Sequence, residues 1–129
     1  MPPIPAAPRR PGLIDRLHIH SRDVAAAKRF YRAVMDALDV PVIEGEGFFF
    51  ADQLWIDAGE RSGHVHLAFN ATGPEMVDRF QQAGLAAGGR SNSAPQDADF
   101  HPGHYAARLM DPDGNLVEAV WRGCLTPCA

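Results

Sequence analysis

Histidine is the residue type with the clearest chemical potential in this chain, because all six histidines occur in three close pairs. The pairs are His18 with His20, His64 with His66, and His101 with His104. Side chains two residues apart in a strand point to the same face, so a His-x-His pair would place two imidazoles side by side. A glutamate, Glu118, follows a turn-forming sequence near the end of the chain. Imidazoles and carboxylates are the usual ligands of zinc, iron, nickel and manganese, so the sequence predicts a metal-assisted enzyme.

The first histidine pair lies in a segment that alternates as a half-buried strand does, with Leu17 and Ile19 on the opposite side from the histidines. Asp23 can cap a helix expected over 24–38, in which apolar residues recur at helical spacing. Three short strand-like runs follow, at 42–43, 48–50 and 54–56. The first half of the chain therefore predicts a strand, a helix and an antiparallel meander.

The same order of elements returns in the second half. We expect a strand at 64–69, a helix that begins at Pro74, a polar loop over 91–100, and strands around 105–110 and 116–121. The last two strands are separated by Asp-Pro-Asp-Gly-Asn, which has proline and glycine at positions that favour a tight turn. The order of elements, strand–helix–strands twice, is the evidence for two similar halves.

The length, charge and composition of the chain exclude some classes of protein. A chain of 129 residues makes one domain, or two small half-domains that share a core. Its net charge of −4 offers no attraction to nucleic acid or to an anionic membrane, and it has no apolar run of about 18 residues. Residues 1–12 are proline-rich and predict a flexible arm, and Cys124 and Cys128 fall in a tail over 123–129. We therefore predict a cytoplasmic protein that binds neither nucleic acid nor membrane.

Four segments together carry a family resemblance. They are residues 14–23 with Phe30-Tyr31, Gly-His-Val-His-Leu-Ala-Phe at 63–69, His-Pro-Gly-His-Tyr-Ala-Ala at 101–107, and Asp-Pro-Asp-Gly-Asn-Leu-Val-Glu at 111–118. In this combination the chain resembles the vicinal oxygen chelate superfamily, which contains glyoxalase, bleomycin-resistance proteins, fosfomycin-resistance enzymes and extradiol dioxygenases.

The resemblance implies an α+β fold of two βαβββ units, over about 13–60 and 63–122, whose strands form an incomplete, cup-shaped mixed barrel. It further implies that the metal lies in the cup. Short members of the family usually form homodimers that complete the cup with strands from both chains, so a homodimer is expected here.

The resemblance also implies metal ligands. It places one at His64, near the start of the second half, and one at Glu118, four residues after the glycine of the closing turn. The family's first-strand histidine would stand at Arg16, so the chain departs from the pattern there. His18, two residues further along the same face, is the predicted substitute. Asp57 is a candidate for a fourth position.

Further residues are expected to line the cup, and Glu118 is also the predicted catalytic residue. The predicted substrate-binding residues are Arg16, His20, Trp55, His66, His101, His104 and Tyr105. The first functional hypothesis is a divalent-metal-dependent lyase, isomerase or dioxygenase that acts on a small substrate with vicinal oxygens, with zinc, nickel, iron or manganese as the metal. The alternative is a metal-free protein that binds or sequesters a small molecule with Arg16. A third and weaker possibility is a structural or regulatory dimer.

Overall fold

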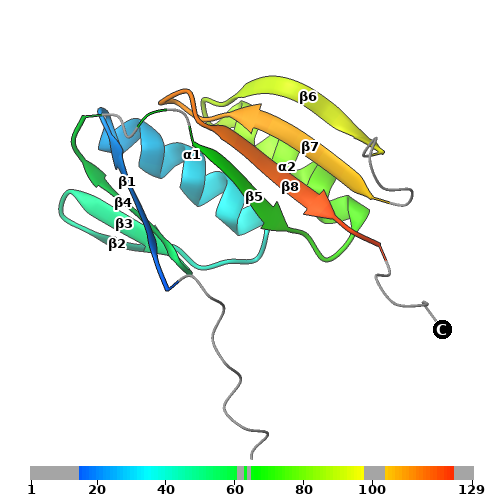
Figure 1. Cartoon of the computed structure of the whole chain (residues 1–129), viewed down its shortest axis with the longest axis horizontal. Helices are drawn as coiled ribbons and strands as arrows, with labels where there is room; N and C mark the ends of the chain where they lie inside the picture. The colour runs from blue at the N-terminus through cyan, green and yellow to red at the C-terminus, as the bar shows by residue number, and fades with distance from the viewer. Residues whose placement is uncertain (1–14, 61–62, 64, 98–103, 124–129) are drawn as a thin grey trace, which may run out of the picture.

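The computed structural model describes residues 15–60, 63, 65–97 and 104–123, and these form two βαβββ units (Figure 1). The predicted arm, most of the predicted tail and both cysteines lie outside the described residues. The first unit contains β1 (Leu17–Ser21), α1 (Val24–Ala37), β2 (Ile43–Gly45), β3 (Phe48–Ala51) and β4 (Leu54–Ala58). The second unit contains β5 (His66–Asn70), α2 (Pro74–Ala86), β6 (Arg90–Asp97), β7 (Tyr105–Met110) and β8 (Leu116–Trp121).

Each unit builds one four-stranded mixed sheet. The strand orders are β1-β4-β3-β2 and β5-β8-β7-β6, so the two sheets have the same topology. The pairs β1–β4 and β5–β8 are parallel, and the other neighbours are antiparallel. The predicted fold class is therefore confirmed: an α+β protein of two βαβββ units, whose sheets stay open across the described residues.

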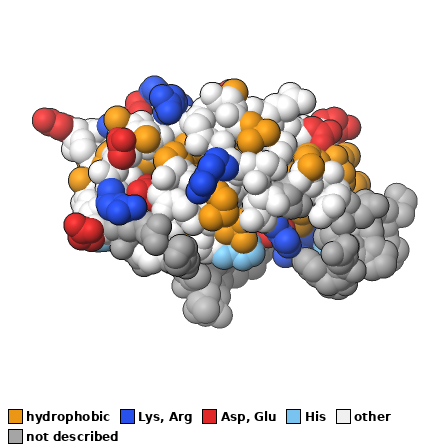
Figure 2. Space-filling model, turned by 90° about the horizontal axis from the view of Figure 1, so that it is seen from above, with side chains coloured by type: hydrophobic (Ala, Val, Ile, Leu, Met, Phe, Trp, Pro, Cys, Tyr) orange, Lys and Arg blue, Asp and Glu red, His pale blue; other side chains and the backbone are white. Residues whose placement is uncertain are grey.

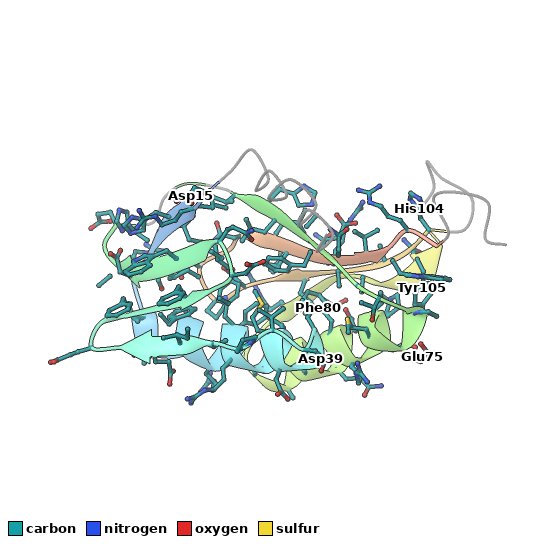
Figure 3. The ribbon with its side chains drawn as sticks, turned by 90° about the horizontal axis from the view of Figure 1, so that it is seen from below. Asp15, Asp39, Glu75, Phe80, His104 and Tyr105 are labelled. Carbon is teal, nitrogen blue, oxygen red and sulfur yellow. The ribbon has the colours of Figure 1, made fainter. Side chains whose placement is uncertain are left out.

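Both helices lie along one side of the sheets, and this side holds the core (Figure 3). Alternate residues of the first sheet, such as Ile19, Phe49 and Ile56, are buried against α1. The two helices pack on each other, and Gly84 permits their close approach to the second sheet. A Cβ atom at Gly84 would lie 2.2 Å from Cδ1 of Leu109, which is far too close. Neither described helix covers the opposite side of the sheets, which we call the outer face of each sheet (Figure 3).

Most predicted elements agree with the structure to within a few residues. The helix α1 begins after Asp23, whose carboxylate accepts a hydrogen bond from the backbone N–H of Ala26, as a capping residue should. The predicted loop over 91–100 was wrong, because its described part, to residue 97, belongs to β6. This edge strand contains Pro95 and pairs with β7 through two register shifts. Pairing with β7 overrides the turn-like composition of the segment, which periodicity alone does not reveal.

A buried hydrogen-bond network joins the closing turn of the second unit to the first unit. Asp111 accepts a bond from the hydroxyl of Tyr31 at 2.5 Å, and Asp113 accepts one from the hydroxyl of Ser21 at 2.6 Å. Asp111 also accepts from the side-chain amide of Asn115 at 2.9 Å. We call these five residues the inter-unit latch. Because Ser21 directly follows His20, the latch fixes the end of β1 that carries the first histidine pair.

The surface shows no concentration of one charge on the face seen in Figure 2, where basic and acidic side chains are interspersed. Of the two helices in the described residues, neither is long and apolar enough to cross a membrane.

Candidate functional site

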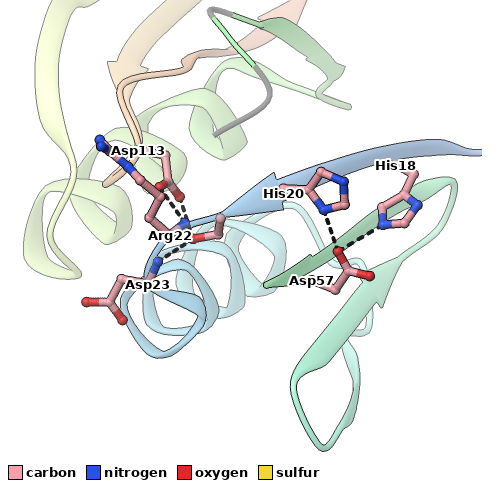
Figure 4. Close-up of polar contacts among 7 residues, drawn as sticks. His18, His20, Arg22, Asp23, Asp57 and Asp113 are labelled. Atoms are coloured by element: carbon pink, nitrogen blue, oxygen red, sulfur yellow. Dashed lines mark hydrogen bonds and ion pairs between the residues drawn. The ribbon is translucent and has the colours of Figure 1, made fainter. Parts of the chain in front are cut away.

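The first histidine pair meets a carboxylate on the outer face of the first sheet (Figure 4). Nε2 of His18 lies 3.0 Å from Oδ1 of Asp57, and Nδ1 of His20 lies 2.7 Å from the same oxygen. The backbone explains this meeting, because β1 and β4 run parallel with His20 opposite Asp57. Side chains two residues apart on β1 share a face, so both imidazoles reach one carboxylate.

This cluster is accessible and its carboxylate is charged. The side chains of His18 and His20 are each 44% exposed, and that of Asp57 is 31% exposed. A hydrogen bond from His18, with a second from His20, holds the pKa of Asp57 below its ordinary value. Asp57 is therefore ionised at neutral pH, and it stands beside two further nitrogen donors.

A second cluster occupies the outer face of the second sheet. Nε2 of His66 lies 3.2 Å from Oε1 of Glu118, and Nε of Arg108 donates to Oε2 of Glu118 at 3.3 Å. Arg108 stands directly opposite Glu118 on β7. The side chain of Glu118 is only 8% exposed, against 53% for His66 and 37% for Arg108. Glu118 is thus a nearly buried carboxylate with a permanent cation on one oxygen.

The two clusters share one backbone register. Asp57 stands opposite His20 on β1, and Glu118 stands opposite Ala68 on β5. The imidazole that contacts the carboxylate from two residues earlier is His18 in the first unit and His66 in the second. Each unit therefore carries the same histidine–carboxylate pair at the same place in its sheet.

The neighbours of this repeated pair differ between the units. On the parallel strand, the first unit has His20 where the second has Ala68. On the antiparallel strand, the residue opposite the carboxylate is Phe48 in the first unit and Arg108 in the second. The first unit thus adds a nitrogen donor to the pair, and the second adds a cation.

Aromatic side chains and Arg16 continue the outer face of the first sheet. The ring of Trp55 is stacked on those of Phe48 and Phe50, with ring centroids 4.9 and 5.3 Å apart. The guanidinium carbon of Arg16 lies 5.7 Å from the centroid of the Trp55 ring. Within the described residues, no carboxylate is paired with Arg16, so its charge is available to an anionic group.

Two other predicted substrate-binding residues, His104 and Tyr105, lie where β7 begins (Figure 3). His104 is buried and directly precedes this strand. The hydroxyl of Tyr105 donates to Asp78 of α2 at 2.7 Å, which places this side chain on the helix side of the sheet. His64 and His101 lie outside the described residues, so the ligand set of His64, Glu118 and His18 stays a prediction.

Sequence reasoning missed Arg108, which places a permanent positive charge against Glu118. Its only signal is a lone cation within the otherwise uncharged strand at 105–110. The sequence predicts Asp57 only as a fourth ligand, because the lengths of the meander strands leave its register open. The structure settles this register by pairing β4 with β1.

A groove of about 640 Å³ lies at the seam between the units, where Leu17 and Leu54 face Leu67 and Phe69. This volume suits a small molecule. None of the histidines or carboxylates of the two clusters lines the groove, so it is separate from their chemistry.

The first cluster fits a divalent ion by its donor chemistry. The ligand atoms of His18, His20 and Asp57 all lie within 4.8 Å of one another, and they form the one such group of three among the described residues. Two imidazoles and one carboxylate suit zinc, nickel or iron(II), and they leave coordination positions open.

Comparisons with known proteins agree with this fold. Residues 13–119 match the model of a family described as the Glyoxalase/Bleomycin resistance protein/Dioxygenase superfamily. No significant match was found among curated protein sequences.

Solved structures show the same architecture. A glyoxalase/bleomycin resistance protein from Albidiferax ferrireducens is 28% identical, with a TM-score of 0.73 over 84% of this chain and 97% of that chain. A lactoylglutathione lyase from Agrobacterium tumefaciens is 22% identical, with a TM-score of 0.62 over 87% and 95% of the two chains. The fosfomycin resistance protein FosX from Mesorhizobium loti is 19% identical, with a TM-score of 0.65 over 91% and 97%. The last two likenesses concern the fold alone.

Proposed function

Because the chain belongs to the Glyoxalase/Bleomycin resistance protein/Dioxygenase superfamily, we propose that it is a divalent-metal-dependent enzyme. Its reaction is that of a lyase, isomerase or dioxygenase, and its substrate is a small molecule with two adjacent oxygen atoms. The observation that carries this proposal is the histidine–carboxylate pair repeated on the outer faces of both sheets, at 3.0 Å in one unit and 3.2 Å in the other.

The residues of the two outer faces have separate roles in this proposal. A divalent ion bound to imidazole and carboxylate ligands there supplies Lewis-acid polarisation of the substrate's adjacent oxygens. Glu118 accepts a proton from the substrate carbon and returns it to the product, with His66 beside its Oε1 atom. Arg16 binds an anionic group of the substrate next to Trp55.

A homodimer is part of the proposal, because the two outer faces belong to separate open sheets and a second chain can close them into one cup. Light scattering after size exclusion should give twice the 14.0 kDa mass of the chain. A cytoplasmic location belongs to the same proposal, and cell fractionation would test it.

Metal content and activity test the proposed function together. The full chain would be purified without chelator and incubated with zinc, nickel, iron(II) or manganese. Its activity would then be assayed on small α-dicarbonyl and catechol compounds. We expect at least one ion to remain bound per chain, and turnover that a chelator abolishes and the metal restores. A protein that binds none of the four metals would contradict the proposal.

One observation favours a second candidate, a metal-free protein that binds a small anion. Arg16 occupies the position of the first-strand histidine that the resemblance implies, and its guanidinium lies over Trp55. In this alternative the aromatic side chains and Arg16 hold a planar anion without turnover.

Benzoate, a planar anion, can test the alternative in chelator-treated protein. If this function holds, Arg16→Ala weakens benzoate binding at least about tenfold, as loss of a charge-assisted bond of about 1.4 kcal/mol or more would. Arg32→Ala, in which the lost arginine pairs with Glu44 on the surface, is the matched control. Equal benzoate binding by both variants would exclude this use of Arg16.

A further inference from the structure

The repeated pair raises the question of which unit binds the ion. The two units present the same imidazole and carboxylate at the same register. The ligand set implied by the resemblance draws on both units, with Glu118 as a member. The neighbours of the two carboxylates, however, make them unequal as cation ligands.

We propose that the divalent ion binds within the first unit, to His18, His20 and Asp57, and that Glu118 is not a metal ligand. The proposal rests on the proposed function only in assuming that the chain binds a divalent ion. It departs from the ligand set of His64, Glu118 and His18, and it places the site on two strands of one sheet.

The geometry of the first unit already brings three donors together. Nε2 of His18 and Nδ1 of His20 both point at one oxygen of Asp57, at 3.0 and 2.7 Å. These contacts are now made through imidazole protons, and an ion that binds displaces such protons. Because the ligand atoms lie within 4.8 Å of one another, small rotations of three partly exposed side chains suffice to surround an ion.

The remaining coordination positions face solvent. The three side chains are between 31% and 44% exposed, so water or a substrate oxygen can reach an ion held there. Nitrogen donors outnumber oxygen donors, which favours zinc, nickel or iron(II) over magnesium or calcium. Arg16 and Trp55 extend the same outer face and lie next to this position.

The second unit is a poor cation site for two reasons. Arg108 donates to one oxygen of Glu118, and its permanent charge repels an incoming cation. Ala68 stands where the first unit has His20, so the third donor is missing. Glu118 therefore keeps its contacts with Arg108 and His66 and stays outside the coordination of the ion.

Matched carboxylate variants can decide between the units. Full-length wild type, Asp57→Asn, His20→Ala and Glu118→Gln would be dialysed against zinc and against cobalt(II) in metal-defined buffer. Bound metal would be measured by elemental analysis, and the cobalt(II) visible spectrum would report the ligands. We expect Asp57→Asn and His20→Ala to weaken binding at least about 100-fold, because even the loss of an outer-shell contact costs 10- to 100-fold. Glu118→Gln should bind one ion with nearly wild-type affinity and spectrum.

A gain-of-site variant gives an independent test that does not depend on loss of binding. Ala68→His with Arg108→Leu gives the second unit a third donor and removes its cation, so we expect a second bound ion per chain. Far-UV circular dichroism would confirm that each variant is folded.

Each outcome is informative. Binding lost in Glu118→Gln and kept in Asp57→Asn would overturn the assignment while the proposed metal dependence stands. A wild-type protein that binds neither zinc nor cobalt(II) would overturn the assignment, and one that also binds none of nickel, iron(II) and manganese would overturn the metal dependence as well.

Discussion

The first and second units carry the same histidine–carboxylate pair, and yet they differ in what the pair can do. In the first unit, His20 joins the pair and Asp57 remains open to solvent. In the second unit, Arg108 joins the pair and Glu118 is nearly buried. The backbone pairing is the same in both, so the surroundings of the two carboxylates differ through side chains on the neighbouring strands. In the proposed assignment, this difference separates cation binding in the first unit from proton transfer in the second.

The inter-unit latch holds the two units together, because it fixes the end of β1 against the turn that leads into β8. Asp111 is 2% exposed, and it accepts four hydrogen bonds from described residues of both units. Replacing it with alanine leaves these donors buried without an acceptor. We therefore expect Asp111→Ala to lower the free energy of unfolding by about 4 kcal/mol. Urea denaturation would measure it.

Asp36→Ala is the control for this prediction, because Asp36 is exposed on α1. It should change the free energy of unfolding by less than about 0.5 kcal/mol. Should Asp111→Ala cost no more than Asp36→Ala, the latch would not be what holds the two units in register.

The latch also predicts a dependence of stability on pH. Burial, with the nearby charge of Asp111 and the hydrogen bond to it, raises the pKa of Tyr31 well above its ordinary value of 10.0. Below pH 10 the hydroxyl is protonated in both the folded and the unfolded chain, so its contribution is complete. Above pH 10 the unfolded chain releases this proton first, so stability falls as the pH rises towards the raised pKa.

The measurement is urea denaturation between pH 8 and 11, with Tyr31→Phe beside the wild type. Near neutral pH the variant should be less stable by about 2 kcal/mol, because Asp111 loses a charge-assisted hydrogen bond. Its loss of stability above pH 10 should be shallower than that of the wild type. Parallel curves for the two proteins would show that Tyr31 does not titrate on unfolding.

Much of this molecule is predictable from the order of its elements, and the parts that were not share a physical cause. Alternation and capping locate β1, α1 and β8, because these signals are local. The strand β6 was not predicted because its pairing with β7 does not appear in its own composition. For the same reason the sequence did not predict the contact of Arg108 with Glu118 or the position of Asp57 beside the first histidine pair. Their partners are fixed by strand register, and register depends on turns whose lengths the sequence leaves open.

The guanidinium of Arg108 can be removed to test what it contributes to the free energy of unfolding. Among the described residues, Arg108→Met leaves His66 as the one charged partner of the nearly buried Glu118. Because the arginine is partly exposed, we expect the free energy of unfolding at pH 7 to fall by about 1 kcal/mol. Arg32→Met removes an arginine whose side chain is 65% exposed and pairs with Glu44. That control should cost less than about 0.5 kcal/mol. Equal effects would mean that Arg108 is only a surface ion pair.

Removal of either exposed imidazole, His18 or His66, should have the smallest effect on stability. His18 and His66 make equivalent contacts, and both imidazoles are exposed, at 44% and 53%. In chelator-treated protein, His18→Ala and His66→Ala should therefore each change the free energy of unfolding by less than about 0.5 kcal/mol. Urea denaturation at pH 7 would test this. A loss above about 1.5 kcal/mol in either variant would show that the pair serves the stability of that unit. Two equally small losses would mean that folding does not require either pair, so their difference must lie in what each unit binds.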